Sequence, residues 1–68
     1  MTRWHGHVPT HDDFDRLITD EFIDGVEKAS MKWCYMTPAS FKEYGVGLGT
    51  GKGQRYKKVN GDWVKVEG

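Results

Sequence analysis

The first part of the chain carries a helical pattern of apolar and polar positions. Thr10 and Asp13 resemble a capping box, with Asp in place of the usual Glu. At roughly 100° per residue, the apolar residues that follow share one side: Phe14, Leu17, Ile18, Phe22, Val26 and Ala29. We therefore expect an amphipathic helix over residues 10–29 with an acidic outer face. Because Ile23 lies off the apolar side and Gly25 costs a helix roughly 1 kcal/mol, a break near residues 24–25 is the alternative.

The middle of the chain predicts short elements. Residues 31–36 are apolar and rich in aromatic side chains, which favours a strand. Thr37 and Pro38 then predict a short helix over residues 38–44, because threonine caps a helix and proline suits its first turn. Glycine at every second position of residues 45–53 predicts a loop, either flexible or closely approached by other backbone.

The strongest pattern is a C-terminal β-hairpin over residues 54–66. Asn60-Gly61 suits the positive φ angles of a type I′ turn. Pairing residue 59 with residue 62 places three valines on one face, which we expect to point to the core: Val59, Val64 and Val66. The other face is then aromatic and basic, with Tyr56, Lys58, Trp63 and Lys65.

Together these elements predict an α+β fold, with one amphipathic helix packed on a small antiparallel sheet that has a C-terminal β-hairpin. Residues 1–9 are expected to form an N-terminal arm whose Trp4 packs against the domain or a partner, and residues 10–68 a single small domain. The expected core is Phe14, Leu17, Ile18, Phe22, Val26, Trp33, Tyr35, Phe41, Tyr44, Val59, Val64 and Val66. Such a thin core is marginal unless a partner or a second copy supports it.

Composition excludes several classes of protein. A single cysteine in 68 residues cannot form an internal disulfide or a cysteine zinc finger. No apolar run approaches the roughly 20 residues that cross a bilayer. We therefore expect a soluble, cytoplasmic protein without a membrane partner; a homo-oligomer stays open.

The net charge of zero conceals an uneven distribution. Residues 1–30 contain three basic and seven acidic side chains, whereas residues 31–68 contain seven basic and three acidic ones. Lysine and arginine neutralise phosphates, and aromatic rings stack on unpaired bases. The leading hypothesis is therefore a nucleic-acid-binding module that uses the glycine-rich loop and the hairpin, through Lys52, Arg55, Tyr56, Lys57, Lys58, Trp63 and Lys65. The alternative for Tyr56 and Trp63 is a core pair past which the lysine stems extend.

The acidic half supports a second hypothesis. A small accessory or inhibitory protein, of the kind that phages and mobile elements encode, would bind a larger protein through the acidic helix face. The residues expected to carry this binding are Asp13, Asp20, Asp24 and Glu27.

No catalytic or cofactor-binding pattern stands out, so we expect neither an enzyme nor a cofactor. The glycine-rich stretch lacks the P-loop spacing, because Val46 stands where Gly51-Lys52 would require glycine. Cys34 lies in an apolar run and is expected to be a buried small residue. We predict no metal site, although the sequence leaves open whether His5, His7 and His11 bind a metal.

Overall fold

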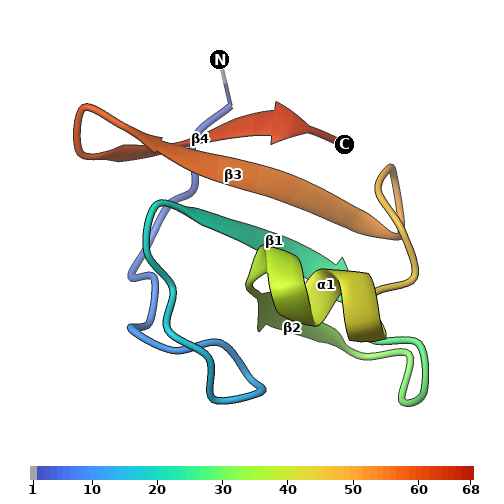
Figure 1. The fold of residues 1–68 in the computed structure, drawn as a ribbon. Coiled ribbons are helices and arrows are strands. Elements are labelled where there is room, and N and C mark those ends of the chain that lie inside the picture. Colours follow the sequence, from blue (N-terminus) through green and yellow to red (C-terminus); the bar gives the residue numbers. More distant parts are fainter. Residues whose placement is uncertain (1) are drawn as a thin grey trace.

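The computed structural model describes residues 2–68, which form one helix and a four-stranded antiparallel sheet (Figure 1). The elements are β1 (Glu21–Val26), β2 (Trp33–Met36), α1 (Pro38–Tyr44), β3 (Gly53–Val59) and β4 (Asp62–Glu67). The strand order is β2-β1-β3-β4. The predicted α+β class and the C-terminal hairpin are confirmed. No helix among residues 2–68 has the length and apolar character needed to cross a membrane.

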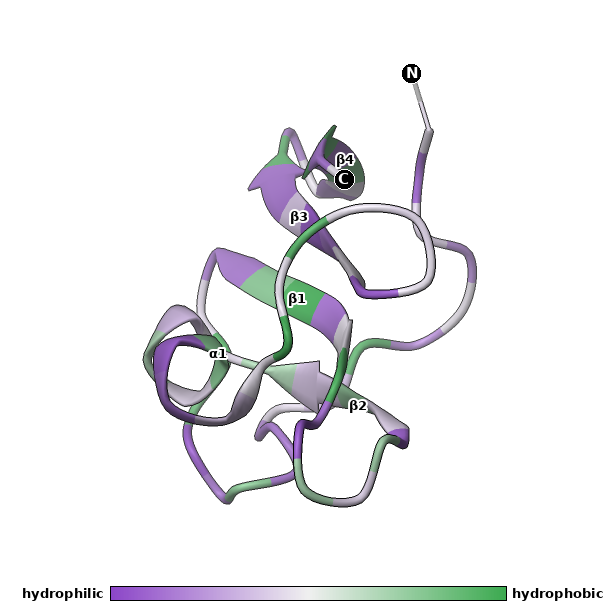
Figure 2. Cartoon of the chain, turned by 90° about the vertical axis from the view of Figure 1, so that its right-hand side faces the viewer, coloured by the Kyte–Doolittle hydropathy of each residue, from purple (hydrophilic) through white to green (hydrophobic). Residues whose placement is uncertain are grey.

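The amphipathic helix predicted over residues 10–29 is wrong. Its second half is β1, the strand between β2 and β3, where Phe22 and Ile23 are both fully buried. Successive residues of a strand point to opposite faces, and here both faces of the sheet are covered. Ile23, which did not fit a helical face, belongs to the second face. In Figure 2, the apolar residues of β1 lie at the centre of the fold, whereas β3 is mostly hydrophilic.

The two faces of the sheet have different covers. On one face, Phe22 packs with Ile18 and Tyr56, and Trp4 lies edge-on to Phe22 with 5.3 Å between ring centroids. On the other face, Ile23 and its register partner Met36 are fully buried on the side of α1. Other residues expected in the core are instead exposed, namely Leu17, Trp33, Val59 and Val66. The buried Ile23 and Met36 were not among the expected core residues, and Tyr56 was expected there only as the alternative to base stacking.

The predicted arm lies along the outer edge of β4. The Trp4 N–H donates to the Trp63 carbonyl at 2.9 Å, and the Lys65 N–H donates to the Thr2 carbonyl at 2.8 Å. The Trp4 ring is half-buried against Phe22, Tyr35 and Tyr56. The segment from Thr2 to Trp4 thus continues the sheet past β4.

A buried carboxylate joins the loop before β1 to the start of α1. Asp12 Oδ1 accepts hydrogen bonds from the N–H groups of Phe14 and Arg16, both at 2.9 Å. Asp12 Oδ2 accepts from the N–H (2.8 Å) and hydroxyl (2.9 Å) of Thr37 and from the Ser40 hydroxyl. Thr37 is also the N-cap of α1, as predicted, because its hydroxyl accepts from the Ser40 N–H.

The glycine-rich loop follows α1 and lies against the sheet. Gly25 and Gly53 face each other across β1 and β3. A Cβ at residue 53 would lie 2.8 Å from the Gly47 carbonyl oxygen and 3.4 Å from the Gly25 Cα. The loop backbone passes too close to residue 53 for any side chain there, so this position needs glycine. Of the two predicted forms of the loop, the structure has the one closely approached by other backbone.

The hairpin has the predicted turn, but its faces are largely reversed. Asn60 and Gly61 have φ angles of 49° and 85°, as a type I′ turn requires. Val64 is buried as expected, whereas Val59 and Val66 are exposed. Tyr56 points into the core instead, because the large aromatic cluster around Phe22 forms on its face of the sheet.

Candidate functional site

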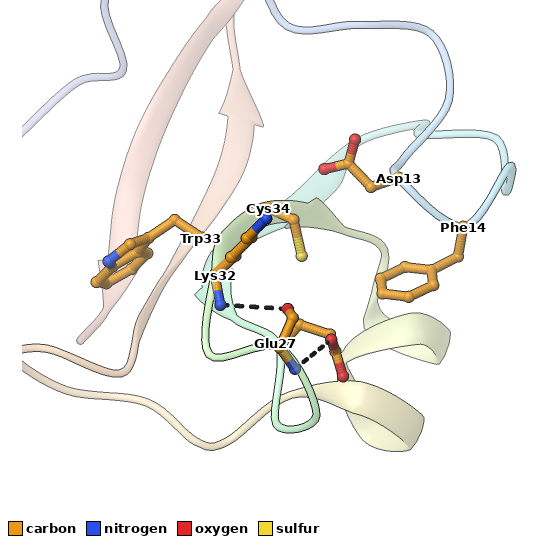
Figure 3. A pocket seen from close by; sticks show the side chains of 7 residues that line it. Asp13, Phe14, Glu27, Lys32, Trp33 and Cys34 are labelled. Atoms are coloured by element: carbon orange, nitrogen blue, oxygen red, sulfur yellow. Dashed lines mark hydrogen bonds between the residues drawn. The ribbon is translucent and has the colours of Figure 1, made fainter.

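A pocket of about 290 Å³ opens between the loop that precedes β1 and the hairpin that joins β1 to β2 (Figure 3). The two segments that form it are far apart in sequence. Together they supply carboxylates, an aromatic ring and a thiol: its lining residues are Asp13, Phe14, Glu27, Ser30, Lys32, Trp33 and Cys34.

The turn on one side of the pocket is held together by Glu27. Its carboxylate accepts hydrogen bonds from the N–H groups of Ala29 (2.7 Å) and Ser30 (2.9 Å). Its carbonyl accepts from the Met31 N–H at 2.7 Å. The bonds from Ala29 and Ser30 hold the pKa of Glu27 below its usual value. The side chain is therefore ionised at neutral pH and fixed in position.

Met31 completes the same turn in an unfavourable conformation. Its φ of 58° is left-handed, a region that costs a residue with a Cβ roughly 1–2 kcal/mol. At 65% exposure, Met31 is also the most exposed large apolar residue among residues 2–68. The turn thus holds an apolar side chain in solvent at a conformational cost.

Phe14 and Cys34 line the interior of the pocket. The Phe14 ring stacks on Tyr44 of α1, with 4.3 Å between centroids and 10° between planes. The Cys34 thiol points into the pocket, whereas the ring of the preceding Trp33 points to the other side of β2 (Figure 3). Trp33 is 50% exposed, unlike the half-buried Trp4 and Trp63.

Asp13 lies on the other side of the pocket and pairs with the outer edge of β2. Its N–H donates to the Tyr35 carbonyl at 3.1 Å, and its Oδ2 accepts from the Tyr35 N–H at 2.7 Å. Asp13 thus takes the place that a residue of a neighbouring strand would occupy. Like Glu27, its carboxylate is held by backbone.

Acidic side chains outnumber basic ones in the pocket lining, which contains Asp13 and Glu27 against Lys32. Burial, together with the nearby charges of Asp13 and Glu27, raises the pKa of the Cys34 thiol to about 11. Cys34 is therefore protonated at neutral pH and lacks the thiolate that a nucleophile needs. Lys32 is the basic residue among those that line the pocket.

The structure brings together only two of the four acidic residues predicted to bind a protein. Asp13 and Glu27 share the pocket. Asp20 lies at the other end of β1, where its carbonyl accepts from the Lys58 N–H at 2.8 Å. Asp24 is half-buried within β1, and burial raises its pKa. The predicted acidic helix face is wrong, because these residues do not lie on a helix.

The aromatic residues predicted to stack on bases are packed inside the fold. Tyr56 is only 7% exposed and stacks on Phe22 at 5.2 Å between centroids. Trp63 is half-buried and lies edge-on to Phe22 at 5.1 Å. Lys58 extends over the Trp63 ring, with Nζ 5.6 Å from its centroid. The alternative interpretation, a core pair with a lysine stem beside it, is therefore confirmed.

The basic residues of the predicted nucleic-acid site have different surroundings. Arg55 is engaged by two carboxylates: its Nη1 lies 2.6 Å from Glu21 Oε1, and its Nε lies 3.1 Å from Glu67 Oε1. Lys52 precedes β3, whereas Lys57 and Lys58 lie near the other end of that strand. The exposed residues of the set are the three lysines Lys52, Lys57 and Lys58, and Lys65 is half-buried.

The histidines of the N-terminal segment form no cluster. His5, His7 and His11 are all exposed. Within the described part of the chain, no three His, Cys, Asp or Glu side chains are placed to hold a metal ion.

Comparison of the chain with protein-family models, curated proteins and solved structures finds no match. Function is therefore inferred from the pocket and the surface around it. Three residues of this surface were not predicted as binding residues. Phe14 and Trp33 had been assigned to the core, and Met31 to a strand. The sequence offers no signal for Met31, because glycine and asparagine are the usual residues in its conformation.

Proposed function

We propose that this chain is a small non-enzymatic protein-binding module. It would dock around the edge strand β2, through the pocket on one side of that strand and through the exposed Met31 and Trp33 next to it. We call this the docking surface: Asp13, Phe14, Glu27, Met31 and Trp33. The observation that carries the proposal is Met31, an apolar side chain that the turn holds in solvent in a left-handed conformation.

No contact within residues 2–68 offsets the free-energy cost of the left-handed Met31 backbone. Met31 is exposed, so its side chain gives the core little buried area. Glycine at this position would relieve roughly 1 kcal/mol of backbone strain. A contact with a partner explains why methionine is present, since methionine adapts to irregular apolar surfaces. Trp33, two residues away, is of the type most enriched among residues that dominate protein–protein binding energy.

The charge of the docking surface favours a basic protein over a nucleic acid. The carboxylates of Asp13 and Glu27 repel phosphate, and they attract lysine and arginine. Binding of nucleic acid through the hairpin stays a prediction. It now depends on exposed lysines without free aromatic rings beside them, since Tyr56 and Trp63 pack against Phe22. The partner we propose is therefore a larger protein with a basic surface. We propose that binding takes place in the reducing cytoplasm, because a free thiol such as that of Cys34 stays reduced there.

The test is affinity capture with tagged protein from nuclease-treated extract of the native cells. We expect the wild-type chain to retain a protein in stoichiometric amount, and Met31→Gly and Trp33→Ala to lose it. Met31→Gly is the sharper variant, because it should fold at least as stably as the wild type. Val66→Ala, at another exposed apolar position, is the matched control and should keep the partner.

Two outcomes contradict the proposal. The first is retention of the same partner by Met31→Gly and Trp33→Ala. The second comes from a parallel capture without nuclease: recovery of nucleic acid and no protein, with binding that is lost at high salt and in the double variant Lys57→Glu, Lys58→Glu, as the hairpin hypothesis predicts.

A further inference from the structure

We infer that the pocket of the docking surface receives the guanidinium group of an arginine from an extended segment of the partner. This inference rests on the proposed function and specifies what the partner presents. It begins with size. A volume of about 290 Å³ lies at the lower end of the roughly 300–1,000 Å³ of pockets that enclose drug-sized ligands. A single side chain therefore fits it better than a nucleotide or a large cofactor.

The carboxylates of the pocket have unused acceptor capacity. Asp13 Oδ2 is engaged by the Tyr35 N–H, whereas Oδ1 accepts no hydrogen bond from residues 2–68. Each oxygen of Glu27 accepts one N–H, from Ala29 or Ser30, and a carboxylate oxygen has a second lone pair. Both groups are already held by backbone, so a cation that binds them loses little to reordering of the site.

The remaining lining distinguishes guanidinium from ammonium. The Phe14 ring, supported from behind by Tyr44, offers a flat aromatic surface. A guanidinium is planar and weakly hydrated, stacks on aromatic rings and carries five N–H donors that can serve two carboxylates together. An ammonium is compact and strongly hydrated, and it gains less from such a surface. The protonated Cys34 thiol adds a polarizable, uncharged contact for the methylene stem.

An open strand edge beside the pocket explains why the segment is extended. β2 is the edge strand of the sheet, and the Tyr35 N–H and carbonyl point outward to Asp13. Peptide groups alternate in direction along an antiparallel strand, so those of Trp33 point outward too. A partner strand can form backbone hydrogen bonds to Trp33, and the partner residue in this pair then faces the same side of the sheet as the Trp33 ring. The next residue of the partner faces the opposite side, which is the side of Cys34 and the pocket.

The experiment uses the blocked tripeptides acetyl-Val-Arg-Val-amide, its citrulline analogue and its lysine analogue. They are titrated into ¹⁵N-labelled protein at constant ionic strength, and binding is followed by NMR. We expect saturable shifts of the Glu27, Ser30, Trp33 and Cys34 amides with the arginine peptide. The citrulline peptide, which has the same shape without the charge, should bind at least tenfold more weakly, and the lysine peptide should bind more weakly than arginine.

Two isosteric variants locate the binding. Asp13→Asn can keep the bond from the Tyr35 N–H through its remaining oxygen and should weaken the arginine peptide at least fivefold with an unchanged spectrum. Glu27→Gln should weaken it at least fivefold too, with shifts confined to the turn at Ala29 and Ser30, where one acceptor oxygen is lost. Asp20→Asn removes the same charge at the far end of β1 and should leave binding unchanged. Equal binding of arginine and citrulline, equal binding of arginine and lysine, or no effect of Glu27→Gln overturns the inference. If capture of a partner still requires Met31 and Trp33 in that case, the proposed function stands and only the arginine assignment fails.

Discussion

Replacing Asp12 by asparagine should destabilise the fold in a way that depends on pH. Asp12 is 6% exposed and joins the loop before β1 to the first turn of α1. Burial alone would raise its pKa, but hydrogen bonds from Ser40, Thr37 and Arg16 outweigh it and lower the pKa from 3.8 to about 2. The folded protein therefore favours the carboxylate, and asparagine removes both the charge and one acceptor oxygen.

The size of the effect follows from this pKa and from the donors left without a partner. A pKa lowered from 3.8 to about 2 corresponds to roughly 2 kcal/mol of stability. The NH₂ group of asparagine cannot accept hydrogen bonds, so the groups that donate to one of the two Asp12 oxygens lose their acceptor. This loss costs roughly another 1 kcal/mol or more. We expect a loss of roughly 3 kcal/mol at pH 7, or a fall in Tm of roughly 12–24 °C for a domain of this size.

The dependence on pH has a definite sign. Because the folded pKa is the lower one, the stabilisation is complete above the unfolded pKa of 3.8 and is lost as the pH falls through about 2. Urea unfolding of the wild type and the variant should therefore show a difference that is roughly 1 kcal/mol smaller at pH 3 than at pH 7.

Asp15→Asn is the matched control. Asp15 is exposed in the same loop and has a φ of 65°, which asparagine tolerates well, so its replacement should have little effect. A loss from Asp12→Asn below about 1 kcal/mol at pH 7, or an equal loss at both pH values, would refute the role assigned to the carboxylate.

Three further predictions concern other parts of the chain. The pKa of Cys34 is about 11 in the folded protein rather than 9.0, so less of the thiol is ionised at pH 8. Iodoacetamide should therefore alkylate Cys34 roughly 100-fold more slowly in the folded protein than in urea, as measured by mass spectrometry. Equal rates would contradict the raised pKa. Gly53→Ala should lower the free energy of unfolding in urea by roughly 1–3 kcal/mol, because its Cβ would lie 2.8 Å from the Gly47 carbonyl oxygen. Thr50→Ala, in the loop before β3, should change that free energy by less than about 0.5 kcal/mol. Trp4→Ala should cost roughly 3–5 kcal/mol and reduce the dispersion of the NMR spectrum. An unchanged Tm would show that the Trp4 ring does not stabilise the aromatic cluster around Phe22.

The features that sequence alone predicted well are those that depend on local chemistry. Asn60-Gly61 specifies a turn because few residues other than Asn and Gly adopt positive φ without strain. Thr37-Pro38 starts α1 because a hydroxyl acceptor and a missing N–H suit that position. Neither signal requires knowledge of what packs nearby.

The wrong helix arose where one pattern has two physical explanations. Thr10 and Asp13 have the spacing of a helix cap, but the side chain that accepts N–H groups further along the chain is that of Asp12, and it holds a loop. The apolar run around Phe22 fits a helix approximately, but it also fits a strand that is buried on both faces. Ile23 and Gly25, the two residues that disagreed with the helix, are the ones that the sheet explains.

The same misassignment concealed the candidate site. Asp13 and Glu27 were predicted to bind a protein, but as members of a helix face. Their actual neighbours depend on a hairpin between β1 and β2, which does not exist if β1 is read as part of a helix. The left-handed Met31 could not be predicted, because no residue pattern marks it.

The glycine pair beneath the loop also bears on the order in which the chain folds. Gly25 belongs to β1 and Gly53 to β3. The stretch of sheet without side chains that they form therefore exists only once these two strands have paired. The loop from Gly45 to Lys52 can settle on it only afterwards. We therefore expect this loop to order late in folding, so that weakening its contacts with the glycine pair speeds unfolding more than it slows folding.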